Sequence, residues 1–187
     1  GSARYTAAVR MSRERGVQVA FESSLNGVAV NLPPPLAKSA GEPRLLRVAL
    51  VQGEGEGRDR ISLGYGPMLR AELLRRREGD AMVVDRSAVA FNPPAGGRLR
   101  LPARADSTLV YGTLERLELD RWTALLERAG GSAEALQATS FELSIGTLDA
   151  FGRRMQDIAV RARVRAGGWR ASLSSAEIAG DVDYEAA

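Results

Sequence analysis

Residues 158–165 read Ile-Ala-Val-Arg-Ala-Arg-Val-Arg. Ile158, Val160 and Val164 occupy one set of alternate positions, and arginines fill most of the positions between them. Successive side chains of a β-strand point to opposite faces of a sheet, so this pattern predicts a strand with one apolar face and one basic face. The same two-residue period recurs along the chain and indicates a β-rich fold.

Further strands are expected wherever this period returns. Val17–Phe21 and Val28–Leu32 flank Asn26-Gly27 and are predicted to form a hairpin. Residues 69–77 fit either a helical turn or a strand, and we favour a strand. The remaining segments with the same alternation are 46–50, 61–65, 82–91, 109–119, 141–145, 169–173 and 181–184.

Two features interrupt this regularity. Around Ser174-Ser175 the apolar positions change parity, and we expect a β-bulge there. One helix is indicated after Asp120, which can cap its free amides, and Gly130-Gly131 is expected to end it. Its apolar face would carry Trp122, Leu125, Leu126 and Ala129.

Strands joined by short turns without intervening helices are typical of an antiparallel meander. The sequence therefore predicts an all-β, mainly antiparallel fold with one short helix. Nearly every strand has an aliphatic face, and one helix cannot cover all of them. Either the sheet closes into a sandwich or it curls into an open trough for an apolar ligand, and the pattern alone leaves both alternatives open.

The composition argues against several functional classes. The chain contains no cysteine and no histidine, which removes the usual zinc ligands and the common proton-transfer side chain. We expect no catalytic centre, metal or cofactor. Lys and Arg total 26 against 23 acidic residues, and acids interleave with the arginines, so we do not expect nucleic-acid binding. Arg161, Arg163 and Arg165 could meet phosphates, but a solvated face that discourages edge pairing is the simpler interpretation.

The chain is expected to form a single β-rich unit over residues 1–187, with a possible sub-boundary near 119–133. Gly1-Ser2 resembles an expression scar, and the alternation still runs at Asp181–Tyr184, so we interpret the chain as a piece of a larger protein. No apolar run approaches the roughly 20 residues that a membrane helix needs.

Three stretches resemble the AsmA-like envelope proteins of the YhdP type from Gram-negative bacteria. The first runs from Gly27 through Leu-Pro-Pro-Pro-Leu to Lys38, with Asn31 where Asp is expected, and continues in Gly41-Glu42-Pro43. The second is Leu117-Glu118-Leu119-Asp120-Arg121-Trp122. The third is the closing run that includes Phe151-Gly152-Arg153-Arg154, Asp157-Ile158, Gly168-Trp169-Arg170 and Glu177-Ile178-Ala179-Gly180.

This resemblance implies a segment of a curved, open, taco-like β-structure in the periplasm, with the parent protein anchored in the inner membrane. Such a protein would carry phospholipid toward the outer membrane along an apolar groove, with the rest of its own polypeptide and other envelope proteins as partners. The alternative is a structural or protein-interaction β-sandwich of the cell envelope without a ligand. The residues predicted to line a lipid groove are Val17, Val19, Phe21, Val48, Ile61, Leu63, Phe141, Leu143, Ile158, Val160, Val164 and Ile178.

Overall fold

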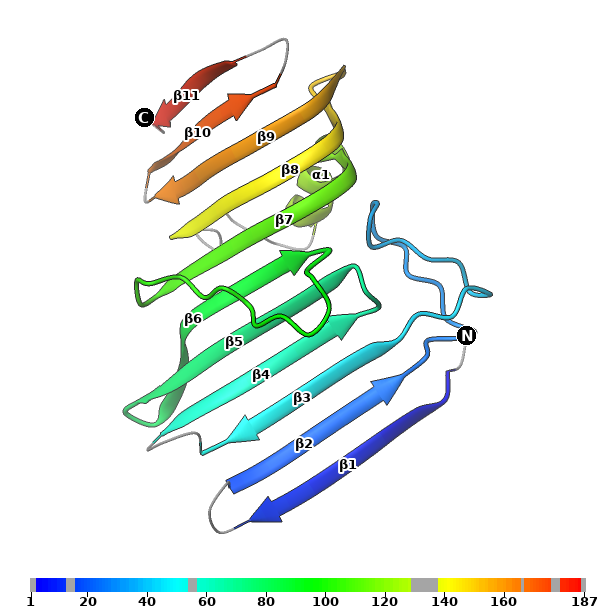
Figure 1. Ribbon diagram of the computed structural model, residues 1–187. Coiled ribbons are helices and arrows are strands. Elements are labelled where there is room, and N and C mark those ends of the chain that lie inside the picture. The colour runs from blue at the N-terminus through cyan, green and yellow to red at the C-terminus, as the bar shows by residue number, and fades with distance from the viewer. Residues whose placement is uncertain are drawn as a thin grey trace.

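The computed structural model describes residues 3–12, 16–53, 57–128, 138–165, 167–175 and 179–185. They form one open, curved sheet of eleven strands whose order in space follows the sequence from β1 to β11 (Figure 1). The strands are β1 (Tyr5–Ser12), β2 (Gly16–Ser23), β3 (Leu46–Gln52), β4 (Arg58–Tyr65), β5 (Leu69–Glu78), β6 (Ala81–Phe91), β7 (Ser107–Glu118), β8 (Thr139–Ala150), β9 (Arg153–Arg165), β10 (Gly168–Ser174) and β11 (Ala179–Glu185). The predicted all-β class with one short helix, α1 (Leu119–Arg128), is confirmed.

Strand pairing departs from a pure meander at two places. β7 is parallel to both β6 and β8, whereas the other neighbours are antiparallel. A parallel pair requires a connection that returns along the sheet, and two long connections do this. Residues 92–106 link β6 to β7, and the segment that begins with α1 links β7 to β8. The ambiguous residues 69–77 are in strand β5, as favoured from the sequence.

The pairing register divides the side chains into two faces. One row of paired residues crosses the whole sheet, and its members are Ala7, Phe21, Val48, Leu63, Ala71, Val89, Val110, Phe141, Ala162, Ala171 and Val182. Paired residues point to the same face. We call the face that carries this row the apolar face. The opposite face carries Ala, Ser, Thr and most of the strand arginines, and we call it the mixed face.

β5 and β6 shift register between Leu74 and Arg75, where Asp85 is left out of the pairing. Elsewhere the alternation changes phase on three adjacent strands together. Apolar residues of one core cluster are three positions apart on each of these strands, namely Leu114 and Leu117, Ile145 and Leu148, and Met155 and Ile158. Asp157 lies in this interval with φ 51°, and a Cβ on Gly146 would lie 2.9 Å from the Glu115 carbonyl oxygen. Because β7, β8 and β9 change phase at the same row, their pairing register is unaffected.

Two sequence predictions about the strands are wrong. Val17–Phe21 pairs with β1 and β3, and residues 28–32 form no strand; Val30 makes only an isolated bridge with Lys38. The prolines at 33–35 lack the ladder donor, which prevents a longer pairing there. The parity change at Ser174-Ser175 is not a bulge, because β10 ends at Ser174 and β11 pairs back against it.

The helix is close to its predicted position. α1 begins at Leu119, which the sequence pattern had placed at the end of a strand. Asp120 was predicted to cap the helix, but it lies inside the first turn of α1, and its carboxylate accepts a hydrogen bond from the backbone amide of Phe151 at 3.1 Å. Ala129 and the predicted stop at Gly130-Gly131 lie outside the described residues.

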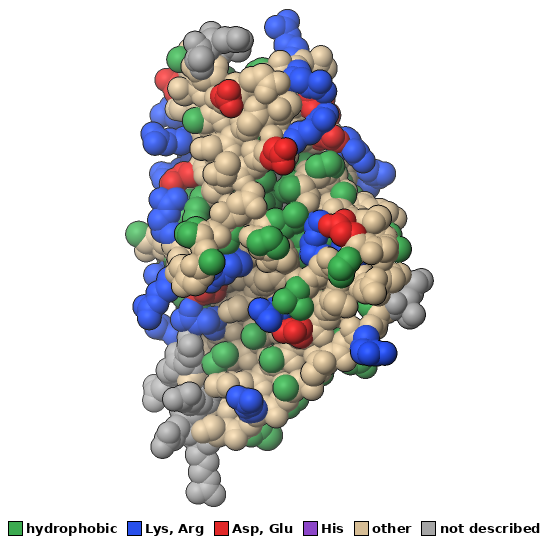
Figure 2. All heavy atoms as spheres, turned by 45° about the vertical axis from the view of Figure 1, so that its right-hand side comes forward, with side chains coloured by type: hydrophobic (Ala, Val, Ile, Leu, Met, Phe, Trp, Pro, Cys, Tyr) green, Lys and Arg blue, Asp and Glu red, His purple; other side chains and the backbone are tan. Residues whose placement is uncertain are grey.

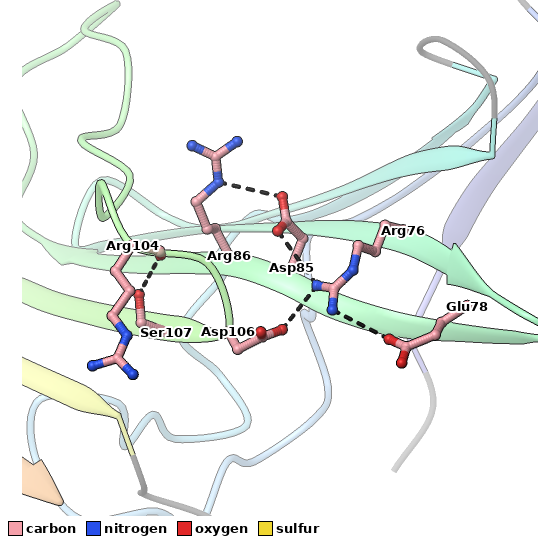
Figure 3. Close-up of polar contacts among 7 residues, drawn as sticks. All are labelled: Arg76, Glu78, Asp85, Arg86, Arg104, Asp106 and Ser107. Carbon is pink, nitrogen blue, oxygen red and sulfur yellow. Dashed lines mark hydrogen bonds and ion pairs between the residues drawn. The ribbon is translucent and has the colours of Figure 1, made fainter.

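The 92–106 connection crosses the mixed face in front of β6 and β7 (Figure 1). Its far end is held by Arg76 of β5, whose guanidinium donates to Asp106 at 2.8 Å and also pairs with Glu78 and Asp85 (Figure 3). Earlier in the connection, the backbone amide of Arg100 donates to the Tyr111 hydroxyl at 2.8 Å. Ala88 and Ala90 of β6 are fully buried on this face.

Candidate functional site: the apolar face of the sheet

The register places the predicted groove residues on one face. Phe21, Val48, Leu63 and Phe141 belong to the row that crosses all eleven strands. Val19 and Ile61 belong to a second row, which also contains Val9, Leu50 and Leu73. The other predicted residues on this face are Val17, Leu143, Ile158, Val160 and Val164, and Ile178 lies outside the described residues.

Several residues of the same face were not among the predicted set. β1 was not predicted at all, although Tyr5, Val9 and Met11 alternate in the sequence and lie on the apolar face. The register adds Leu50, Leu73, Val89, Val110 and Leu173 from the interior strands. Alternation in the sequence was sufficient to find the residues of β1. It could not assign Val110, because Leu109, Val110 and Tyr111 are three successive apolar residues, and the register places Leu109 and Tyr111 on the mixed face.

Most of this face remains partly open to solvent. Val19, Val48, Ile61 and Leu63, which lie in the middle of β2, β3 and β4, are half-buried. Exposure rises toward the two edge strands, where Val9 and Met11 are 64% and 77% exposed on β1 and Tyr184 is 52% exposed on β11. Figure 2 shows apolar side chains at the surface among basic and acidic ones, with basic side chains gathered along the left-hand side of the view. In the described part of the chain no second sheet covers the apolar face.

One part of the apolar face is closed instead. Leu114, Ile145 and Ile158 are at most 3% exposed and form the centre of the core cluster, with Leu119 of α1 packed against it. Two predicted groove residues belong here, because Leu143 and Ile158 are buried in this cluster. Their alternation is the same as that of the open residues, so the sequence pattern could not separate core from open surface.

A second segment lies over the apolar face near the end of β4. Tyr65 is buried and donates its hydroxyl proton to the Leu36 carbonyl at 3.1 Å. The Arg44 guanidinium lies 5.1 Å from the centre of the same ring, a cation–π arrangement. Residues 24–45, which link β2 to β3, are therefore anchored on an apolar-face side chain at the strand ends.

The helix and this loop are connected to each other. The indole nitrogen of Trp122 in α1 donates to the Pro34 carbonyl at 2.9 Å, although the two residues are 88 positions apart. Residues 24–45 together with α1 thus form a continuous structure from β3 to β8 along one end of the sheet, which we call the strap. Beyond the strap, the apolar face of β1 to β5 is uncovered in the described part of the chain.

Ion pairs lie at the margins of the sheet. Arg154 holds the pKa of Asp149 below its usual range through a hydrogen bond, and Arg116 contributes from the other side at 2.5 Å. Arg170 likewise lowers the pKa of Asp183, and the pKa of Arg170 is raised in return. The Asp149 cluster lies near the ends of β7, β8 and β9, and Arg170 and Asp183 lie on the mixed face, opposite the apolar row.

The mixed face contains two hollows. One, of about 640 Å³, lies over small residues that include Ala8, Ala20 and Ala49, beside the Arg47–Glu22 ion pair. The other, of about 1150 Å³, lies between the 92–106 connection and the arginine-bearing face of β9. The predicted basic face of residues 158–165 is thus on the side of the sheet opposite to the predicted groove residues.

Among the described residues, no group of three or more carboxylates could hold a metal ion. Two pairs of carboxylates alternate in the sequence and could in principle act as an acid and a base. Asp181 accepts from Ser172 and Asp183 pairs with Arg170, and Glu54 and Glu56 lie outside the described residues. No described helix is long and apolar enough to span a bilayer.

Comparison with known proteins identifies a family. A model of the family described as YhdP protein matches residues 1–187, which is the whole chain. No curated protein and no solved structure gives a significant match.

Proposed function

Because this chain belongs to the YhdP family, we propose that its apolar face binds the acyl chains of phospholipids and forms part of a path along which lipids move between the inner and outer membranes. Membership places the protein in the cell envelope. The proposal adds that the segment works in the periplasm, that the parent protein is anchored in the inner membrane, and that no catalysis takes place.

One observation carries this proposal. A row of apolar side chains runs without interruption from Ala7 on β1 to Val182 on β11, and its members in β2 to β4 remain half-buried. Monomeric proteins rarely leave large contiguous apolar surfaces uncovered, and such surfaces usually mark a binding partner. A closed sandwich would bury these residues, whereas the described strands form a single open sheet.

The physical mechanism requires no chemistry. An acyl chain gains free energy wherever it replaces water on an apolar surface, at about 25 cal/mol for each Å² that is buried. Val48 and Leu63 are cross-strand partners, and neighbouring members of the row lie about 4.8 Å apart from strand to strand. An acyl chain moving across the sheet would exchange one apolar contact for a similar one. Its binding free energy would therefore change little from one position of the row to the next.

The test compares two substitutions on adjacent strands. Leu63→Glu on β4 places a carboxylate on the apolar face, whereas Ala49→Glu on β3 places the same group on the mixed face, opposite the uncharged Ala20 and Ser62. We expect uptake of a fluorescent phospholipid by the purified protein, and a loss of about tenfold in affinity for Leu63→Glu, equivalent to about 1.4 kcal/mol. Ala49→Glu should bind as the unmodified protein does.

Circular dichroism on both variants provides the folding control. Because Leu63 is half-buried, a carboxylate introduced at this position can remain hydrated and the variant should fold. Absence of lipid uptake by folded, unmodified protein would overturn the proposal and favour a structural or protein-interaction module.

A further inference from the structure

A basic cleft on the mixed face is independent of the apolar face. Its floor is the mixed face of β7 to β10, and residues 100–104 of the 92–106 connection form one wall. Its charged lining residues are Arg100, Arg104, Arg161, Arg163, Arg165, Arg170 and Glu142. Six guanidinium groups therefore face a cleft in which Glu142 is the one acidic lining residue of the described chain.

Most of this positive charge is not neutralised. Arg100 pairs with Glu142 at 2.7 Å, and Arg170 pairs with Asp183. Among the described residues, Arg104, Arg161, Arg163 and Arg165 form no ion pair; Arg163 donates only to the Ser140 hydroxyl, at 3.4 Å. Figure 3 shows the guanidinium of Arg104 turned away from the nearby carboxylates of Asp85 and Asp106. Arg165 contributes, after Arg170, to the lowered pKa of Asp183 without pairing with it. The cleft thus has four cationic groups that lack an ion-pair partner among the described residues.

Arg163 lies directly opposite another arginine, Arg170, on the same face of β9 and β10. Like charges at directly opposite positions destabilise a sheet. Asp183 offsets the charge of Arg170 in the free protein, whereas Arg163 has no acidic partner among the described residues. An anion bound to Arg163 would reduce the repulsion that remains.

The spacing selects the shape of the anion. Arg161, Arg163 and Arg165 alternate along β9, so their Cα atoms are about 6.6 Å apart. An extended polypeptide with a carboxylate at every second residue has the same repeat. A single phosphate could contact only part of this row, and a flat membrane surface fits poorly into a cleft with a wall.

The protein already contains one example of this pairing on the same face. β11 carries Asp181, Asp183 and Glu185 at alternate positions. Ser172 donates to Asp181, and Arg170 pairs with Asp183, from the adjacent β10. An alternating acidic strand is therefore already recognised by the alternating donors of its neighbour.

We propose that the cleft between residues 100–104 and β9 is a docking site for an extended acidic polypeptide segment whose carboxylates occupy alternate positions. The bound segment lies along β9, with guanidinium groups of Arg161, Arg163 and Arg165 on successive carboxylates and Arg104 closing from the connection. Guanidinium–carboxylate pairing of this kind gives an affinity that falls with ionic strength.

The test measures fluorescence anisotropy with the unmodified chain and a labelled ten-residue peptide of alternating Glu and Ser. We expect saturable binding at low salt that weakens in 0.5 M NaCl. The triple substitution Arg161→Gln, Arg163→Gln and Arg165→Gln should lower affinity about tenfold or more. A matched triple substitution outside the cleft, Arg10→Gln, Arg77→Gln and Arg153→Gln, removes the same charge and should change affinity less than about twofold.

Three results would overturn the proposal. The first is that the folded, unmodified protein does not bind the alternating peptide. The second is that both triple variants lose affinity equally. The third is preferential binding, through Arg161, Arg163 and Arg165, of inorganic pyrophosphate, phosphatidylglycerol vesicles or a peptide with five contiguous Glu followed by five Ser. Circular dichroism of both triple variants ensures that loss of fold is not read as loss of the site.

Discussion

Lys38 is the chain's one lysine, and it is buried within the strap. Its ammonium group donates to the carbonyl oxygens of Leu25, Val28 and Ser39, with the Leu25 and Ser39 distances both 2.9 Å. A buried ammonium is costly unless its three donors are satisfied, and these carbonyls provide three acceptors. Lys38, the last residue of the first stretch that resembles the YhdP-type proteins, therefore has a structural role. The sequence alone did not indicate this role.

At the same scale, Asp149 joins three strands. It lies on β8, and its carboxylate pairs with Arg116 of β7 and Arg154 of β9. The hydrogen bond from Arg154 keeps the pKa of Asp149 in the folded protein below that of an unfolded carboxylate. Its stabilising contribution is therefore complete above the unfolded pKa, near 4, and is lost as the pH falls through the lower folded pKa.

We predict that Asp149→Asn lowers the thermal unfolding midpoint at neutral pH. The midpoint of this variant should also fall less than that of the unmodified protein when the pH is lowered below about 4. Circular dichroism melts at a series of pH values provide the measurement. Glu127→Gln, on an exposed residue of α1, is the control and should reproduce the unmodified profile. If the Asp149→Asn variant had the same pH profile as the unmodified protein, this ion-pair cluster would not stabilise the fold.

At the scale of elements, the strap joins two of the stretches on which the family resemblance rests. Pro34 lies in the Gly27–Lys38 stretch and Trp122 at the end of the Leu117–Trp122 stretch, and they share a hydrogen bond. The sequence predicted the helix from its cap and apolar spacing. It could not predict this contact, because local periodicity contains no information about residues 88 positions apart.

We predict that Trp122→Phe loosens the strap while the sheet remains intact. The ring is kept but the Pro34 carbonyl loses its donor, which should lower the free energy of unfolding by about 1 kcal/mol. Hydrogen exchange should accelerate at the amides of Gly27, Val30 and Lys38, which bond within the loop. Denaturant unfolding and exchange mass spectrometry provide the two measurements.

Trp169→Phe is the matched control, because Trp169 lies on β10 and stacks on Tyr184 away from the strap. It should leave the loop amides unchanged. Equal exchange of those amides in Trp122→Phe and the unmodified protein would show that the helix does not hold the loop.

The two parallel pairings are another feature that local patterns could not supply. Alternation identifies a strand but says nothing about its direction relative to a neighbour. Residues 92–97 read Asn-Pro-Pro-Ala-Gly-Gly and indicate a connection, but a long crossover and a tight turn share the same Gly- and Pro-rich composition. The meander was therefore predicted throughout, and β6–β7 and β7–β8 depart from it.

At the scale of the whole molecule, the one continuous sheet explains both successes and failures of the sequence analysis. Because a strand's period assigns side chains to faces, residues such as Val19, Phe21 and Ile61 could be grouped correctly without any coordinates. Whether that face was covered depended on segments far away in the sequence. The buried positions of Leu143 and Ile158 show this limit, since covering by α1 and its neighbours separates them from the open residues.

The central claim is that lipid occupies the apolar face of this sheet in the cell, and site-specific photocrosslinking tests it most directly. A photoreactive amino acid would replace Leu63 or, as the control, Ser62 in the protein within living cells, and adducts would be identified by mass spectrometry after irradiation. The account predicts phospholipid adducts at position 63 and few or none at position 62. Only protein adducts at position 63, or equal lipid labelling at both positions, would contradict it.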